Sequence, residues 1–243
     1  MNAYEKDPPE EPRVPGSDRS DPLPTALVAL TLVTGIVDAV AFLGLGQIFT
    51  AFMTGNILFL GFALAGGEGL EPLGSLTAFA GFAVGAVAGS RLGVAEAGRH
   101  RRWLLASATV ASLLLVAAAL AAIGLRTVTG HLAPRHYVVV VLTALAMGVR
   151  SATMWRLGAM LNTTLVTGTL VTWIRKSALG GGTPDSAQPF RAAAVLAVFA
   201  GAAVGTLLLR VGLTAALLVA AAGVLASVGG YVAHPASRRA PGP

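Results

Sequence analysis

Runs of apolar residues long enough to cross a lipid bilayer constrain this chain more than any other feature. A spanning helix needs about 20 predominantly apolar residues. Only 12% of the residues are charged, about half the share that is usual in soluble domains. The sequence therefore predicts an all-α integral membrane protein. Its apolar segments cover, approximately, residues 24–45, 48–66, 73–91, 103–125, 136–156, 159–174, 190–209 and 212–233.

The second and sixth segments differ from the other six, which fit the length of a spanning helix. Each is short and has a polar interruption near its middle, Thr54-Gly55-Asn56 in one and Thr167-Gly168-Thr169 in the other. Non-helical backbone at membrane depth is tolerated only where protein or a water-filled cavity satisfies it. The sequence thus predicts about six transmembrane helices plus two short broken or re-entrant segments.

Glycines recur at a constant spacing, which indicates an internal repeat. Gly35 and Gly55 are followed 113 residues later by Gly148 and Gly168. A glycine ladder in the third segment resembles one in the seventh at an offset of 116 residues. The ladders are Gly81, Gly85 and Gly89 in the third segment and Gly201 and Gly205 in the seventh. The predicted halves are residues 24–125 and 136–233.

The placement of positive charge favours re-entrant short segments, because cytoplasmic loops carry an excess of Lys and Arg. If all eight segments span, seven of the 17 Lys and Arg lie outside. If the two short segments dip into the membrane and return, only Arg126, Arg135 and Arg210 lie outside. Each half then has three spans, so the second half is inverted relative to the first. Inverted repeats with broken helices are a recurring transporter plan.

The two ends of the chain have a different composition from the single transmembrane domain predicted for residues 23–233. Residues 1–22 contain five prolines and few large apolar residues, which predicts a disordered N-terminal tail. Residues 234–243 form a second short tail. We expect a multi-pass protein of the bacterial inner (plasma) membrane with both termini in the cytoplasm.

Asp38 is the residue most indicative of function. A carboxylate within a membrane helix costs roughly 2.5–3.5 kcal/mol on insertion scales, so such residues usually face a cavity or a partner. One interpretation is a proton or cation site, or an acceptor for a polar substrate. The other is a buried carboxylate that pairs with Arg150 and fixes helix packing. The sequence leaves both open.

The remaining candidate substrate-binding residues cluster around the two interruptions. Their side chains could bond freed backbone groups, a neighbouring helix or a ligand. Together with Asp38, the candidates are Gln47, Thr54, Gly55, Asn56, Arg150, Ser151, Asn162, Thr167, Gly168 and Thr169.

Several functional classes lack support in the sequence. The chain has no cysteine, and its four histidines form no cluster with metal-ligand spacing, so we expect no metal site and no cofactor. The formal net charge is +6, and the Lys and Arg residues lie mostly in short loops without aromatic residues between them. We therefore expect no nucleic-acid partner. No nucleotide-binding loop or nucleophile–base arrangement is present, which argues against an enzyme.

Two sequence stretches resemble the YoaK family of bacterial membrane proteins, described as a domain of unknown function. The first is Gly35-Ile36-Val37-Asp38-Ala39 followed by Phe52-Met53-Thr54-Gly55-Asn56; the second is Gly148-Val149-Arg150-Ser151-Ala152 followed by Val166-Thr167-Gly168-Thr169. The resemblance covers roughly residues 24–232. It implies the membrane fold and singles out Asp38, Thr54, Gly55 and Asn56. Arg150-Ser151 stands where the family usually has a Gln-Asn pair.

Two functions remain as expectations. The first is a secondary transporter or channel for a small polar solute or ion, with Asp38 as the coupling or binding group. The second is a non-transporting structural or assembly protein of the membrane. The expected partners are the lipid bilayer and the solute, and the glycine ladders are candidate faces for contact between copies.

Overall fold

Helices dominate the structure, a computed structural model that describes residues 22–67, 72–96, 98–129, 131–157, 166–183 and 185–238. The predicted N-terminal tail lies outside these residues, except for Pro22. Two short 3₁₀ turns, Ala178–Gly180 and Pro235–Arg238, accompany the α-helices. In chain order the α-helices are α1 (Leu23–Gly44), α2 (Met53–Leu64), α3 (Pro72–Ala95), α4 (His100–Ala121), α5 (Pro134–Arg156), α6 (Val166–Arg175), α7 (Gln188–Leu209) and α8 (Leu213–Ala233).

Six of these helices, all except α2 and α6, are long and apolar enough to cross a membrane. Helix α2 has 12 residues and α6 has 10, which correspond to lengths of about 18 and 15 Å. A bilayer core is about 30 Å thick, so neither short helix can span it. The predicted all-α membrane fold, with six long helices and two short segments, is confirmed.

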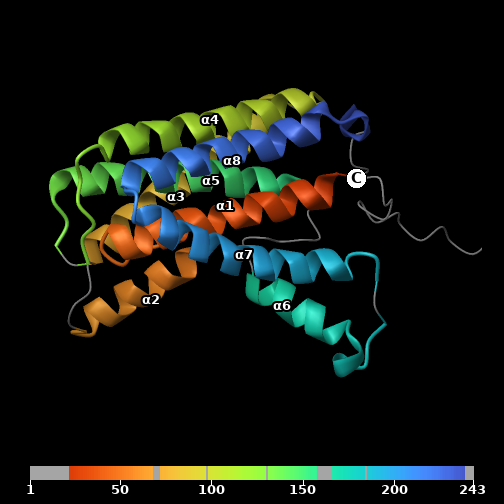
Figure 1. Cartoon of the computed structure of the whole chain (residues 1–243), viewed down its shortest axis with the longest axis horizontal. Helices are drawn as coiled ribbons and strands as arrows, with labels where there is room; N and C mark the ends of the chain where they lie inside the picture. The colour runs from red at the N-terminus through yellow and green to blue at the C-terminus, as the bar shows by residue number, and fades with distance from the viewer. Residues whose placement is uncertain are drawn as a thin grey trace, which may run out of the picture.

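The long helices form one bundle with α1 and α5 at its centre (Figure 1). Two thirds of the most apolar window of each of these two helices is buried, 67% in both cases, whereas the other four long helices are less buried. Helix α7 packs on α1, α3 packs on α5, and α4 packs on α8. Helices α1, α4 and α7 run in one direction, and α3, α5 and α8 run in the other (Figure 1). The short helices α2 and α6 both lie on the face opposite α4 and α8, one toward each end of the bundle (Figure 1).

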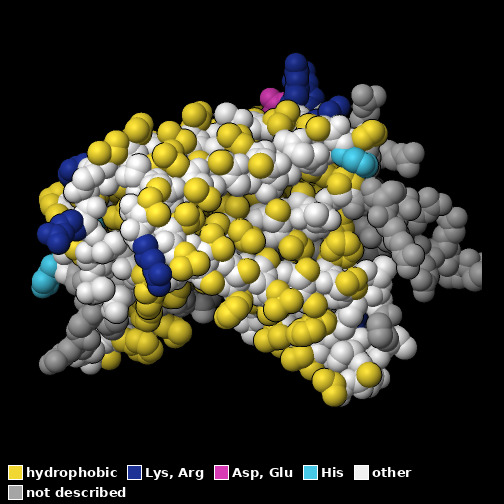
Figure 2. Space-filling view, in the orientation of Figure 1, with side chains coloured by type: hydrophobic (Ala, Val, Ile, Leu, Met, Phe, Trp, Pro, Cys, Tyr) yellow, Lys and Arg dark blue, Asp and Glu magenta, His cyan; other side chains and the backbone are white. Residues whose placement is uncertain are grey.

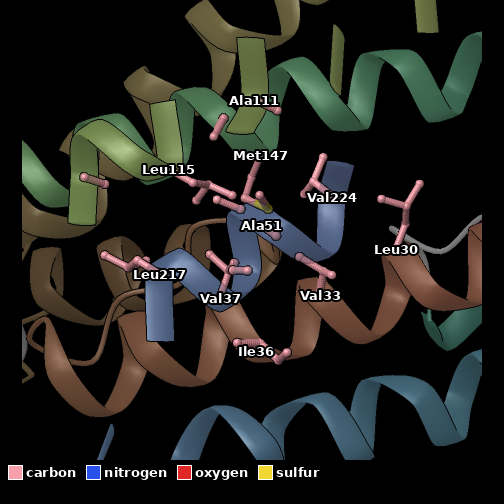
Figure 3. Packing of buried hydrophobic residues seen from close by; sticks show 14 of the residues in the cluster. Leu30, Val33, Ile36, Val37, Ala51, Ala111, Leu115, Met147, Leu217 and Val224 are labelled. Atoms are coloured by element: carbon pink, nitrogen blue, oxygen red, sulfur yellow. The ribbon is translucent and has the colours of Figure 1, made fainter. Parts of the chain in front are cut away.

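The hydrophobic core lies between α1, α4, α5 and α8 (Figure 3). Val37 of α1, Leu115 of α4 and Met147 of α5 are fully buried there, together with Leu217 of α8. Ala51 joins this core from the loop that precedes α2. Large apolar side chains also cover the outer sides of the bundle, while Lys and Arg lie mostly toward its ends (Figure 2). That distribution suits a protein surrounded by lipid.

Glycines allow the closest helix contacts, and they do so in the same way in two places. A Cβ on Gly205 of α7 would lie 2.7 Å from the carbonyl oxygen of Ile36 in α1. A Cβ on Gly89 of α3 would lie 2.7 Å from the carbonyl oxygen of Val149 in α5. Both glycine ladders therefore pack inside the molecule, so a contact between copies would have to use another surface.

The chain enters and leaves the α2 region at one end of the bundle. Gly44, the last residue of α1, lies beside Thr127 of the α4–α5 connection. Gly74, near the start of α3, lies beside Leu132 of the same connection. The segment between α1 and α3 therefore re-enters. Arg126, Arg135 and Arg210 all belong to connections or helix starts at this end, which we call the arginine-poor end.

The positions predicted for the two interruptions are wrong. Thr54, Gly55 and Asn56 lie in the first turn of α2, and the non-helical stretch is residues 45–52 immediately before it. Thr167, Gly168 and Thr169 likewise lie in the first turn of α6. In the first half the Thr-Gly pair therefore follows the non-helical stretch and belongs to the helix. The C-terminal tail also begins with a packed turn, since the buried Ser237 hydroxyl donates to the Val232 carbonyl oxygen at 2.9 Å.

Candidate functional site

A buried loop of residues 45–52 separates α1 from α2 and is the most unusual backbone in the described part of the chain. Leu45 pairs with Val128 in an isolated bridge, and Gly46 and Gln47 follow with φ angles of 84° and 60°. These left-handed conformations turn the chain back into the bundle. Gln47 thus serves the turn, and no polar contact links it to the other predicted site residues in the structure as described.

Asp38 of α1 binds this loop through both oxygens of its carboxylate. Its Oδ1 accepts hydrogen bonds from the backbone N–H groups of Thr50 and Ala51, both at 2.8 Å, and from the Thr50 hydroxyl at 3.2 Å. Its Oδ2 accepts from the backbone N–H of Phe52 at 2.9 Å. Because helix starts leave N–H groups unpaired and carry partial positive charge, Asp38 acts as a distant cap for α2.

Asn56 of α2 holds the same loop from the other side. Its Oδ1 accepts from the backbone N–H of Phe49 at 3.0 Å, and its Nδ2 donates to the Phe49 carbonyl oxygen at 2.6 Å. The Asn56 side chain is fully buried. Gly55 leaves room for the Phe49 ring, because a Cβ there would lie 2.5 Å from a ring carbon. Gly55 and Asn56 together therefore hold the loop against α2, Gly55 by leaving space and Asn56 by hydrogen bonding.

The pairing of Asp38 with Arg150 that one interpretation invoked is not formed. Arg150 of α5 reaches α1 one to two turns earlier, where it donates to the Leu30 carbonyl oxygen at 2.6 Å and to the Thr34 hydroxyl. No ion pair within 4 Å links it to Asp38. Arg150 therefore ties α5 to α1, and Asp38 ties α1 to the loop.

The predicted second-half residues lie apart from this loop. The Ser151 hydroxyl is buried and has no hydrogen-bond partner among the described residues. Thr169 is buried on α6, whereas Thr167 and Gly168 are exposed there. Asn162 lies outside the described residues. Of the eleven predicted positions, the structure brings Asp38, Asn56 and the neighbouring Gly55 together around one loop.

Two cavities flank the loop. The larger, about 420 Å³, lies between the start of α2, α3 and α5 and is lined by Thr54, Ser90, Ser151 and three aromatic residues. The smaller, about 250 Å³, lies between α1 and α7 and is lined by Asp38, Thr206 and mostly apolar groups. Phe52 borders both. Phe52 and the loop thus stand between the two spaces.

Several of these residues could not be selected from the sequence. The main partners of Asp38 are backbone N–H groups, which every non-proline residue carries. Ser90 and Thr206 look like isolated polar residues in apolar helices, and only their position opposite the loop gives them a role. Within the described ranges, no three His, Asp or Glu side chains lie close enough to hold a metal ion.

Comparison with known proteins agrees with this architecture. A family model described as "Protein of unknown function (DUF1275)" matches residues 26–230. The UPF0700 transmembrane protein YoaK of Bacillus subtilis (strain 168) is 34% identical over 147 residues, which are 60% of this chain and 63% of that protein. The match thus spans a little under two thirds of YoaK. No solved structure matches the chain. The family match includes all six long helices, and the chain therefore belongs to the DUF1275 family of membrane proteins.

Proposed function

We propose that the protein is a secondary transporter or channel for a small polar solute or ion. The observation that carries this proposal is a non-helical loop, buried inside a membrane bundle, with a cavity on each side. Irregular backbone at such depth is characteristic of sites where it lines a cavity, and broken helices form the substrate sites of many transporters.

The similarity of the two cavities supports an inverted repeat. Ser151 and Ala152 of the larger cavity stand 113 residues after Asp38 and Ala39 of the smaller one. In the facing helices, Thr206 stands 116 residues after Ser90. These are the offsets that the glycines give, and the corresponding helices run in opposite directions. Two equivalent spaces on opposite sides of one loop are a suitable framework for alternating access.

The distribution of charge supports an orientation in the inner membrane. The connections from α3 to α4 and from α6 to α7 lie at the end opposite the arginine-poor end (Figure 1). Together with the helix turns beside them, they carry Arg99, Arg101, Arg102, Arg175, Lys176 and Arg191. By the positive-inside rule, that end faces the cytoplasm. Both termini then face the cytoplasm as well.

The contacts of Asp38 favour a positioning role over a coupling role. Its carboxylate accepts four hydrogen bonds from the loop and the Thr50 hydroxyl, which uses most of its acceptor capacity. A group engaged in this way orders the loop between the cavities. The solute then contacts the cavity walls, and Asp38 acts through the loop.

Flux measurements on purified protein in liposomes test the proposal. Liposomes with the wild-type protein should admit at least one of a panel of small polar solutes and ions faster than protein-free liposomes. Ala152→Phe fills the larger cavity and should slow that flux. Leu113→Phe on the exposed surface of α4, where 62% of the side chain is accessible, is the matched control and should not.

The structural or assembly alternative has one observation in its favour. Asp38, Asn56 and Arg150 each hold two parts of the same chain together. If no solute or ion in the panel moves faster than through protein-free liposomes, transport is rejected and this alternative stands.

A further inference from the structure

The larger cavity carries an inference about the class of solute. It rests on the proposed transport function. We infer that the cavity between α2, α3 and α5 binds a small neutral solute that both donates and accepts hydrogen bonds, such as a short polyol.

Hydroxyl groups supply the polar part of this site. Thr54 at the start of α2, Ser90 of α3 and Ser151 of α5 come from three different helices and line one space, which opens at the surface because Thr54 and Ser90 are exposed. Ser151, at its inner wall, is only 4% exposed, and its hydroxyl has no hydrogen-bond partner among the described residues. A buried hydroxyl without a partner costs free energy, which a bound solute would recover. Each hydroxyl can donate and accept, so the three suit a ligand with hydroxyl groups of its own.

The described lining of the cavity contains no charged side chain. The buried charges of Asp38 and Arg150 are committed elsewhere, since Asp38 binds the loop and Arg150 binds α1. An ion in this space would lose its hydration without gaining an opposite charge, which is costly in a membrane. A neutral solute avoids that cost.

The start of α2 would otherwise favour an anion. Helix starts attract negative groups because their N–H groups are unpaired and the helix dipole is positive there. At α2 that position is occupied by the Asp38 carboxylate. The chain thus supplies a negative group of its own next to the start of α2, which opposes the binding of a second negative group in the cavity beside it.

The walls and the size of the cavity agree with a small solute that has apolar edges. Phe52, Phe82 and Trp155 line it together with small alanines. Its volume of about 420 Å³ lies in the lower part of the range for small-molecule sites. A three- or four-carbon polyol fits, and its C–H edges can pack on the aromatic rings.

Osmotic swelling of proteoliposomes tests the inference with defined probes. Glycerol and erythritol are the neutral probes, and choline and lactate are the charged probes of comparable size. We expect glycerol or erythritol to enter faster than in protein-free liposomes, and choline and lactate to enter no faster. This comparison uses the wild-type protein, so it decides the inference even if a variant fails to fold.

Variants then locate the site. Ser151→Ala should slow neutral-solute entry about fivefold, the loss expected from one hydrogen bond. Ser151→Thr retains the hydroxyl and should restore most of it. Ser227→Ala on α8 removes a hydroxyl that lines neither cavity and should leave entry unchanged.

Each other outcome has a definite meaning. Entry of choline or lactate without entry of the polyols would overturn the inference and leave transport standing. Equal effects of Ser151→Ala and Ser227→Ala would overturn the assignment to this cavity. Entry of no probe or other solute would reject the proposed function itself.

Discussion

The two short helices, α2 and α6, are held in the bundle by opposite means. Helix α2 is fixed at its start, deep in the bundle, where Asp38 binds the backbone just before it. Helix α6 is fixed just beyond its end, where Lys176 pairs with Asp185 of the connection to α7 at 2.5 Å. Asp185 also pairs with Arg191 of α7 at 2.6 Å. One anchor is buried and the other is partly exposed to solvent.

This difference shows that the long helices and the short ones are specified separately. The glycine contacts of α1 with α7 and of α3 with α5 are nearly equivalent, whereas the aspartate that anchors α2 binds backbone N–H groups and the aspartate that anchors α6 pairs with basic side chains. A buried loop needs hydrogen-bond acceptors that water cannot supply, so the first half has a carboxylate in α1. In the proposed repeat, the position 113 residues later is Ser151 of α5, whose hydroxyl has no hydrogen-bond partner among the described residues.

The largest predicted effect is at Asp38. Asp38→Ala leaves three buried backbone N–H groups and the Thr50 hydroxyl without an acceptor, at a cost of about 1–3 kcal/mol for each group left buried and unpaired. We expect a loss of about 3–5 kcal/mol in stability and a fall of about 10 °C in the melting temperature of the detergent-solubilised protein. Asp38→Asn keeps one acceptor oxygen and should lose less.

Ser151→Ala is the matched control in the other half. Its hydroxyl has no partner, so its removal should change the melting temperature by less than about 2 °C. Equal destabilisation by Asp38→Ala and Ser151→Ala would show that the carboxylate does not anchor the loop.

The second prediction concerns the glycine contacts that join α7 to α1 and α3 to α5. Gly205→Ala and Gly89→Ala each place a Cβ 2.7 Å from a carbonyl oxygen, of Ile36 and Val149 respectively, so each should separate a helix pair. Both should cost about 1–3 kcal/mol, as overpacking generally does. Gly61→Ala in α2 has nothing within 4 Å and should be neutral or slightly stabilising. Melting temperatures of the three variants check this. A clear difference between Gly205→Ala and Gly89→Ala would contradict the equivalence of the two contacts.

The sequence was sufficient to predict the long helices because their apolar length is a strong signal. It also identified Asp38 and Asn56, since a buried carboxylate and a buried amide are rare in such segments. It could not give their partners, which are mostly backbone groups of residues 49–52. The break was placed a few residues too late for the same reason: Thr54-Gly55 is visibly polar, whereas the loop itself is largely apolar.

Arg150 shows another limit of the sequence. Its depth along the helix made Asp38 a plausible partner, but a pairing depends on the direction of the side chain as well. In the structure the guanidinium group binds the Leu30 carbonyl oxygen and Thr34, one to two turns away along α1. Helix spacing alone does not separate these two arrangements.

The third prediction tests the second contact of the α2 anchor. Asn56→Leu removes both hydrogen bonds to Phe49 and leaves that backbone N–H and carbonyl oxygen without them. We expect a loss of about 2 kcal/mol in stability, measured by thermal unfolding. Asn56→Asp keeps the acceptor for the Phe49 N–H and loses the donor to the Phe49 carbonyl oxygen, so its stability shows how much each of the two bonds contributes. Thr54→Ala, which alters an exposed side chain in the same turn, should have little effect.

The smallest effect is expected at the anchor of α6. The hydrogen bonds and charges of Arg191 and Lys176 hold the pKa of Asp185 below its ordinary value of 3.8. A depressed pKa means that the folded state favours the ionised form, so this stabilisation is present above about pH 4 and is lost as the pH falls further. Asp185→Asn should therefore lower stability at pH 7 by less than about 1 kcal/mol, because the site is partly exposed. The difference between wild type and variant should shrink between pH 5 and pH 3 and should be smaller in high salt. Melting curves over that pH range measure it. A difference that is independent of pH would mean that Asp185 holds α6 through packing alone, and the contrast with the buried anchor of α2 would then rest on depth rather than on charge.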